Sequence, residues 1–177
     1  MIFEITLIVL NLLLIAYVMA VTIKRGNDAD NAAVTVEFIV LDKVNEIIGY
    51  ATKGAACIDI RSTKDFILKP GEQVKINSGL KIWIKDTHYA AILLPRSGLG
   101  SKGLNLSHTA GVIDSDYQGE MMIPLKNTGT EDIAIERGQR IVQLGFFRID
   151  QAAFQKKDAF SCKTDRGAGG FGSTGTK

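Results

Sequence analysis

The sequence predicts an all-β fold, a sandwich or a barrel, for most of its 177 residues. Apolar residues from position 34 onward recur with a period of two, as in Val34, Val36, Phe38 and Val40, which is typical of a half-buried strand. Further short apolar runs follow, and turn sequences such as KPGE (69–72) and NTG (127–129) separate them. Many short strands divided by turns indicate a sandwich or barrel.

The expected elements follow one another closely along the chain. After the strand at 34–40, strand-like runs occupy residues 57–61, 66–68, 73–76, 80–84, 90–94, 121–125, 133–136 and 141–147. One short helix is expected near residues 97–102. The segment 165–177 is rich in glycine, so we expect a mobile arm unless a ligand orders it.

The N-terminal segment is expected to be a membrane anchor. Residues 5–23 carry no charge, and about 19 helical residues would extend about 28 Å, close to the roughly 30 Å of a hydrocarbon core. Glu4 precedes this run and Lys24 and Arg25 follow it, which disfavours a cleaved signal peptide and places the rest of the chain in the cytoplasm. A helix buried in an oligomer is the remaining alternative.

These observations divide the chain into four parts. Residues 1–25 are the expected single-pass anchor, 26–33 a small and polar linker, 34–164 the β domain and 165–177 the arm. A net charge of +2 without a basic run gives no support to nucleic-acid binding. Cys57 and Cys162 lie far apart, without metal-ligand spacing or a disulfide framework, which fits a reducing compartment.

The segment GVIDSDYQGE (111–120) carries the strongest chemical signal. It is interpreted as two strand ends around an acidic turn, with Val112 and Ile113 holding the turn to a core. Asp114 follows this apolar pair and precedes Tyr117, and a fixed carboxylate beside an aromatic face suits a general base acting on a ring-shaped substrate. A solvated turn is the alternative interpretation of these residues.

Three other segments offer groups for binding anions. PRSGLGSKG (95–103) has a guanidinium, hydroxyls and glycine amides on one loop, which suits a polyphosphate. GQRIVQL (138–144) contains Arg140 and Gln143 as polar breaks in a strand that should be largely buried. RGAGGFGSTG (166–175) combines a cation, hydroxyls and Phe171 on a pliable backbone.

Together with AACIDIRS (55–62), these segments occur in the order and approximate spacing of the five motifs of trimeric dUTP pyrophosphatases (dUTPases), so the chain after the linker resembles that family. The resemblance implies a β-barrel or jelly-roll with one short helix. It also implies a homotrimer with shared active sites, in which dUTP is hydrolysed to dUMP and pyrophosphate.

The resemblance also implies residue roles. Segment 111–120 would form a hairpin that reads uracil through backbone groups of Gly111, Val112 and Ile113. Asp114 would bind the 3′-hydroxyl and activate water at the α-phosphorus, and Tyr117 would pack on the sugar and disfavour a 2′-hydroxyl. His108 stands where many members have asparagine near uracil, so base contact and solvent exposure both remain open for it.

The phosphate groups and the metal are assigned in the same way. Ser97, Gly98 and Gln143 would contact phosphates, with Arg96 beside them as a ligand or a bridge between subunits, and Arg140 would support the site through a buried ion pair. In the arm, Arg166 would clamp the γ-phosphate, Phe171 would stack on uracil, and Gly170, Gly172, Ser173 and Thr174 complete the binding segment. Mg²⁺ would be held by the triphosphate and water without a direct protein ligand, with Asp59 near its water shell or, alternatively, capping a strand.

Two other functions remain as alternatives. dCTP deaminases share a similar TAG-x-ID stretch, but they need a glutamate on the next strand that GEMMIPLKN (119–127) does not offer at the corresponding place. A membrane-tethered protein that binds dUTP and signals is the other alternative. The intact Asp114, Arg166 and Phe171 favour the enzyme.

Overall fold

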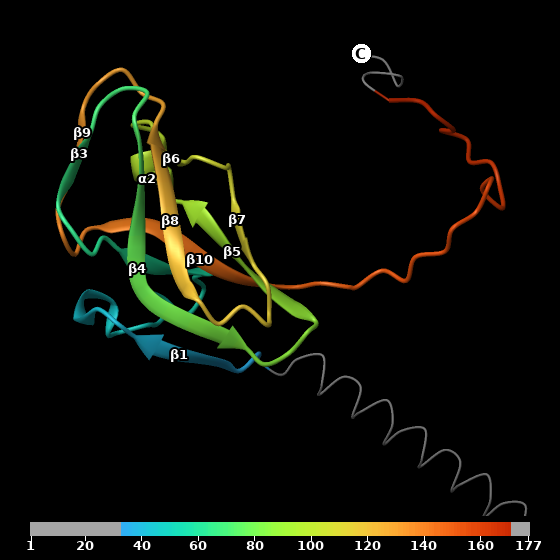
Figure 1. The fold of residues 1–177 in the computed structure, drawn as a ribbon, viewed down its shortest axis with the longest axis horizontal. Helices are drawn as coiled ribbons and strands as arrows, with labels where there is room; N and C mark the ends of the chain where they lie inside the picture. Colours follow the sequence, from blue (N-terminus) through green and yellow to red (C-terminus); the bar gives the residue numbers. More distant parts are fainter. Residues whose placement is uncertain (1–32, 171–177) are drawn as a thin grey trace, which may run out of the picture.

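Antiparallel β-strands form nearly all of the regular structure in the computed structural model, which describes residues 33–170 (Figure 1). The period-two pattern is visible in the burial of strand β8, whose residues alternate between half-buried and buried along their whole length. The strands are β1 Val36–Val40, β2 Cys57–Arg61, β3 Phe66–Leu68, β4 Gln73–Ile84, β5 Tyr89–Pro95, β6 Leu104–Leu106, β7 Gly111–Ile113, β8 Glu120–Asn127, β9 Ile133–Ile135 and β10 Arg140–Arg148. The expected short helix is α2 Ser97–Gly100, and a 3-10 turn, η1 Lys43–Asn45, follows β1.

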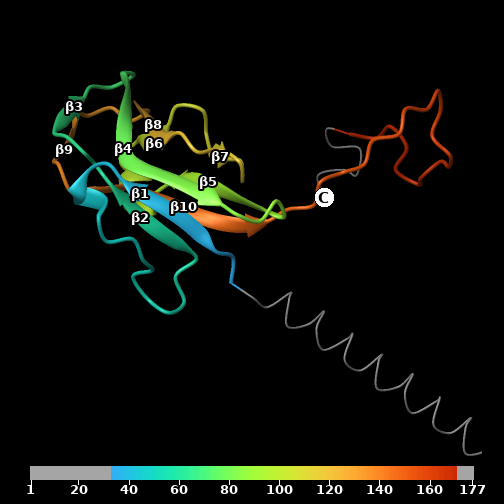
Figure 2. The ribbon, with the colours of Figure 1, turned by 60° about the horizontal axis from the view of Figure 1, so that its bottom comes forward.

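Two four-stranded sheets enclose the core. Their strand orders are β1-β4-β8-β6 and β2-β10-β5-β7, while β3 and β9 form a separate pair at one end (Figures 1 and 2). The facing side chains are aliphatic and fully buried, among them Ile60, Ile76, Leu93, Ile123 and Leu144. The prediction of an all-β sandwich or barrel with one short helix is therefore confirmed.

Strand β4 differs from the prediction, which divided it into two strands at 73–76 and 80–84. It is one 12-residue strand that pairs with both β1 and β8. The apolar pattern is interrupted because the strand contains a bulge: Asn77 lies opposite Met122 whereas Lys81 lies opposite Glu120. Gly79 has a φ of 72° within this bulge, a conformation in which glycine is unstrained.

The segment 111–120 is also built differently from the expected hairpin. β7 pairs with β5 in one sheet, while β8 pairs with β4 and β6 in the other, so the loop between them crosses from sheet to sheet. Ile113 packs against the core, but the side chain of Val112 is 65% exposed. The expectation that both residues hold the loop to a core is therefore wrong for Val112.

The chain after β10 leaves the sheets. Residues 149–170 form no helix or strand, and Figures 1 and 2 show them extending away from the β domain. Among residues 33–170 no helix has the length and apolarity needed to cross a bilayer. The predicted anchor and linker up to residue 32, together with residues 171–177 of the predicted arm, lie outside the described residues.

Candidate active site

Four residues singled out by the sequence meet where β2, β10 and the end of β5 lie side by side. Asp59 Oδ1 lies 2.8 Å from Arg96 Nε, and Asp59 Oδ2 lies 3.4 Å from Arg140 Nη1. Gln143, the register partner of Asp59, donates from Nε2 to the Pro95 carbonyl at 2.9 Å. Arg140 therefore has an ion-pair partner as expected, although its side chain is 45% exposed rather than buried. We call these four residues, together with Ser97 directly after Arg96, the phosphate cluster, after the ligand that the sequence predicts for this region.

Asp59 lies in the middle of β2, not at its end, so the alternative of a strand cap does not describe it. One Asp59 oxygen forms an ion pair with the Arg96 guanidinium and the other with the Arg140 guanidinium, so both cations balance the charge of this carboxylate. The neighbouring thiol of Cys57 is half-buried, and burial, followed by the negative charge of Asp59, raises its pKa. A thiol with a raised pKa stays protonated at neutral pH and is a poor nucleophile.

The loop after β5 presents Ser97 and Gly98 at its surface. Ser97 is the first residue of α2, and both residues are exposed. A Cβ atom on Gly98 would meet nothing within 4 Å, so the chain's own packing does not require a glycine there. The open space over Gly98 allows another molecule to approach the backbone closely.

The second group of predicted residues lies in the loop between β7 and β8. Asp114 follows β7 directly and is exposed, and its carbonyl accepts from the Tyr117 N–H at 3.2 Å. The Tyr117 side chain folds back over Gly119, where a Cβ atom would lie 2.6 Å from Tyr117 Cζ. The Tyr117 hydroxyl donates to the Glu120 carbonyl at 2.9 Å. Tyr117 is 42% exposed, so its ring is not part of the core and is accessible to a ligand.

The chain just before β7 forms a tight turn. The Ala110 N–H donates to the His108 carbonyl at 2.9 Å, and Thr109 between them has a φ of 73°. These two features define a γ-turn of the strained, positive-φ kind. The exposed His108 ring lies over Gly111, because a Cβ atom there would be 3.3 Å from His108 Cε1.

Sequence reasoning missed two residues of this region. Thr109 shows no signal, since a threonine is not expected at positive φ. The sequence marks Glu120 only as the end of a motif, yet its carboxylate accepts from the Gly79 N–H at 2.9 Å and from Asn77 Nδ2 at 2.8 Å. The one available signal is that Glu120 is the first residue of β8, where a carboxylate can bind a neighbouring strand.

The phosphate cluster and Asp114 lie toward opposite ends of β5. Ile113, next to Asp114, pairs with Ala91, whereas Arg96 and Ser97 follow Pro95. The four residue steps from Ala91 to Pro95 correspond to about 13 Å of strand. The two groups of residues therefore do not come together within one chain.

The described part of the arm has turns of its own. Arg166 Nε donates to the Gly169 carbonyl at 2.9 Å, and the Gly167 N–H donates to the Thr164 carbonyl at 3.1 Å. Upstream, the side chains of Phe154 and Phe160 are 96% and 95% exposed. Gly170 is the last described residue, and the predicted contacts of Phe171, Gly172, Ser173 and Thr174 lie outside the described residues.

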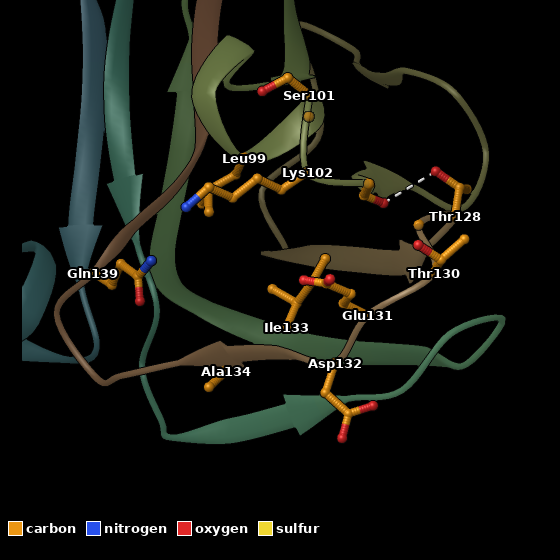
Figure 3. A pocket seen from close by; sticks show the side chains of 13 residues that line it. Leu99, Ser101, Lys102, Thr128, Thr130, Glu131, Asp132, Ile133, Ala134 and Gln139 are labelled. Carbon is orange, nitrogen blue, oxygen red and sulfur yellow. Dashed lines mark hydrogen bonds between the residues drawn. The ribbon is translucent and has the colours of Figure 1, made fainter.

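A pocket of about 670 Å³ opens between α2, β9 and the loop after β8 (Figure 3). None of the predicted site residues lines it. Lys102 is accompanied there by Glu131 and Asp132, so the charged lining is net negative. A net negative lining disfavours a polyphosphate, and we place the candidate site elsewhere.

Comparisons with known proteins identify the family of this chain. A family model described as dUTPase matches residues 44–175. The deoxyuridine 5′-triphosphate nucleotidohydrolase of Shewanella pealeana is 49% identical over 131 residues, covering 72% of this chain and 86% of the relative. That of Neisseria meningitidis serogroup C is 44% identical over 148 residues, covering 81% of this chain and 98% of the relative.

The fold is similar to that of a solved phage enzyme. The dUTPase of Staphylococcus bacteriophage 80alpha, solved with dUPNHPP, superposes with a TM-score of 0.73 at 27% identity, covering 80% of this chain and 98% of the phage chain. The family match spans both groups of candidate residues and the strands that carry them. The chain therefore belongs to the dUTPase family.

Proposed function

We propose that this chain hydrolyses dUTP to dUMP and pyrophosphate. Family membership carries this conclusion, since relatives that are 49% and 44% identical are named for that reaction. The phosphate cluster adds an independent physical reason. It gathers two guanidiniums, a hydroxyl and an open backbone at the end of β5, which together suit the oxygens of a triphosphate.

Asp114 is the proposed general base. Its carboxylate is exposed, so a water molecule can reach it and transfer a proton to it. The water oxygen attacks the α-phosphorus, the bond from that phosphorus to the bridging oxygen of the β-phosphate breaks, and pyrophosphate leaves. Tyr117 packs against the deoxyribose, while backbone groups of 111–113 receive the uracil, with the His108 ring beside them over Gly111.

Mg²⁺ is the proposed cofactor. The described residues 33–170 contain no group of three His, Cys, Asp or Glu side chains arranged to hold a metal. Asp59 is occupied by two guanidiniums, which fits a cation held mainly by triphosphate oxygens and water. When bound, Mg²⁺ neutralises phosphate charge and helps to align the α-phosphorus for in-line attack.

The proposed active unit is a homotrimer with shared sites. A general base must lie within hydrogen-bonding reach of the attacking water, yet Asp114 and Ser97 of one chain lie at opposite ends of the segment 91–95 of β5, about 13 Å long. A site that uses both therefore needs Asp114 from one chain and the phosphate cluster from another. The exposed Phe154 and Phe160 support the same arrangement, because large apolar side chains on an extended segment indicate a partner surface.

The proposed location is the cytoplasmic side of a membrane, with residues 5–23 as the anchor. Support comes from the uncharged apolar run and from Lys24 and Arg25 after it. Deleting residues 1–25 should leave a soluble, active trimer, and the full chain should resist carbonate extraction from membranes. A truncated chain that is monomeric would instead make the segment an assembly element.

The reaction is tested by measuring pyrophosphate release from dUTP with Mg²⁺. Asp114→Asn should lower kcat by roughly 10²–10⁴-fold, the usual contribution of a general base. Asp116→Asn is the matched control, because Asp116 lies in the same exposed loop and has no assigned role. A well-folded wild-type trimer that releases no pyrophosphate would leave the binding and signalling alternative.

A further inference from the structure

The bulge in β4 leaves backbone groups of this strand without their regular hydrogen-bond partners in β8. Between Asn77 and Lys81 the strand has more residues than the facing part of β8, so its ladder to β8 is interrupted at Ser78, Gly79 and Leu80. Buried backbone groups in such a break need other partners. Asn45 Nδ2 donates to the Ser78 carbonyl at 2.9 Å, and the Leu80 N–H donates to Ser78 Oγ at 3.1 Å.

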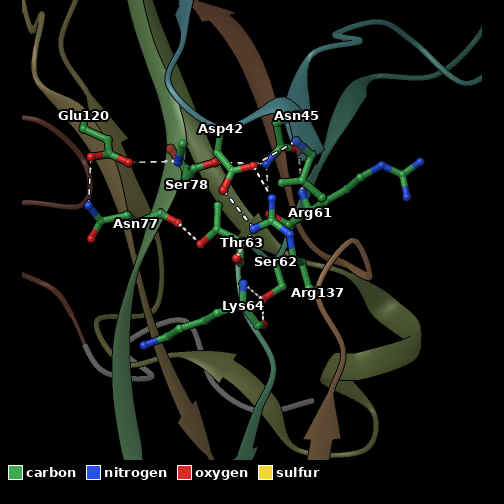
Figure 4. A network of polar contacts seen from close by, with 12 residues as sticks. Asp42, Asn45, Arg61, Ser62, Thr63, Lys64, Asn77, Ser78, Glu120 and Arg137 are labelled. Atoms are coloured by element: carbon green, nitrogen blue, oxygen red, sulfur yellow. Dashed lines mark hydrogen bonds and ion pairs between the residues drawn. The ribbon is translucent and has the colours of Figure 1, made fainter.

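Glu120 supplies the partner for the Gly79 N–H. Its Oε1 accepts from that amide at 2.9 Å, and its Oε2 accepts from Asn77 Nδ2 at 2.8 Å (Figure 4). The other side of Gly79 is fixed as well, because its carbonyl accepts from the N–H groups of Leu41 and Asp42 at 2.7 and 3.1 Å. The carboxylate of Glu120 is therefore held by a rigid part of the neighbouring strand.

Glu120 also ends the loop that carries the proposed base. Its own carbonyl accepts from the Tyr117 hydroxyl, and the Tyr117 ring lies over Gly119. The other end of the loop is fixed by β7, from which Asp114 emerges. The position of Tyr117 relative to Asp114 thus depends on where Glu120 is held.

We propose that Glu120 is a positioning residue of the active site, acting through Tyr117 rather than on the substrate. By clamping the start of β8 to the β4 bulge, it sets the distance of the Tyr117 ring from the sugar and so the discrimination between dUTP and UTP. This inference rests on the proposed function. If the Tyr117 ring moves away from the sugar, ribose fits as well as deoxyribose, and the discrimination between dUTP and UTP falls.

The Asn77–Glu120 pair allows a rescue experiment. Asn77→Asp places two carboxylates together and should displace Glu120. Glu120→Gln keeps both contacts, since the glutamine oxygen accepts from Gly79 and its amide donates to a flipped Asn77. In the double variant Asn77→Asp/Glu120→Gln, the glutamine amide donates to the new aspartate carboxylate. The double variant should therefore recover the discrimination between dUTP and UTP that the single Asn77→Asp change loses.

The first measurement is the ratio of kcat/KM for dUTP to kcat/KM for UTP. We expect Asn77→Asp and Glu120→Ala to lower this ratio by about tenfold, with recovery in the double variant and near wild-type behaviour in Glu120→Gln. A purely structural role would reduce the active fraction and change both substrates equally. Glu120→Ala provides a second route to the same answer should Asn77→Asp fail to fold.

The second measurement is amide hydrogen exchange at Gly79 in the substrate-free trimer, which reports on the clamp without any reaction. Exchange should be faster in Asn77→Asp and return to the wild-type rate in the double variant. Faster exchange with an unchanged dUTP/UTP ratio would overturn the positioning role alone. A wild-type trimer inactive on dUTP would overturn the proposed function and this role together, which distinguishes the two failures.

Discussion

At the scale of single residues, Thr109 is the one non-glycine residue among 33–170 with a positive φ. It has a φ of 73° at the centre of a γ-turn, and its β-branched side chain suits that conformation poorly. Replacement by glycine removes the steric cost, so Thr109→Gly should raise the free energy of unfolding by about 1 kcal/mol. Urea unfolding at fixed protein concentration measures this.

Thr109→Ala is the control for that change, because alanine keeps the Cβ atom at the same φ. It should give little or no stabilisation. Equal stabilisation by alanine and glycine would mean that the branched side chain, rather than the backbone conformation, is the source of the strain.

A second prediction at this scale concerns Asp42 and Arg137. Arg137 Nη2 and Nη1 lie 2.6 and 2.8 Å from the two Asp42 oxygens, and Asp42 Oδ1 also accepts from the Val44 N–H. The Arg137 side-chain hydrogen bonds and then the Val44 N–H lower the pKa of Asp42. The stabilisation is therefore present above the carboxyl's unfolded pKa and is lost as the pH falls through the lower folded value.

Asp42→Asn should lower the unfolding midpoint at pH 7, and its difference from wild type should shrink as the pH is lowered below about 4. Thermal unfolding across this range measures the difference. If the difference does not depend on pH, the loss of stability comes from side-chain packing or from capping of η1 by Asp42, and not from the charge of its carboxylate.

At the scale of secondary-structure elements, the sequence predicted most strands because one face of each is buried. The alternation in β8 was visible in this way. The continuity of β4 was not, since its bulge is completed by Asn45 and Glu120, which are distant in sequence. The crossing of segment 111–120 from one sheet to the other was not predicted either, because the sequence of a strand does not specify which strand it pairs with.

Gly79 in this bulge is a position where a side chain should be costly. A Cβ atom there would lie 2.5 Å from Asp42 Cβ, and the φ of 72° adds strain. Gly79→Ala should therefore reduce the free energy of unfolding by about 2–4 kcal/mol. Gly71→Ala is a matched control, because Gly71 has a φ of 81° but an added Cβ would meet nothing within 4 Å; it should cost about 1 kcal/mol.

At the scale of the whole molecule, the candidate site was predictable as a set of residues but not as an arrangement. The motifs identify Asp114 and the phosphate cluster, and only the pairing of β5 with β7 shows that one chain holds them apart. The contacts of Arg96 and Arg140 with Asp59 likewise depend on the neighbouring positions of β2, β5 and β10. Such neighbours are set by long-range pairing and leave no local pattern in the sequence.

Shared sites lead to a prediction that two defective chains restore one another. Asp114→Asn and Ser97→Ala should each be strongly impaired alone, because each removes one half of every site. In trimers reassembled from an equal mixture, about a quarter of the sites should combine an intact Asp114 from one chain with an intact Ser97 from another, by random assortment around the symmetric assembly. Pyrophosphate release should then rise to about that fraction of the wild-type rate.

The control for this experiment is the same mixture kept as separate preformed trimers, without a denaturation step that allows chains to exchange. Activity should stay at the sum of the two single variants. If reassembled mixtures also stay at that sum while wild-type chains treated identically recover full activity, each site must take Asp114 and Ser97 from the same chain. The loop between β7 and β8 would then have to move by roughly 13 Å, the distance from Ala91 to Pro95 along four residue steps of β5.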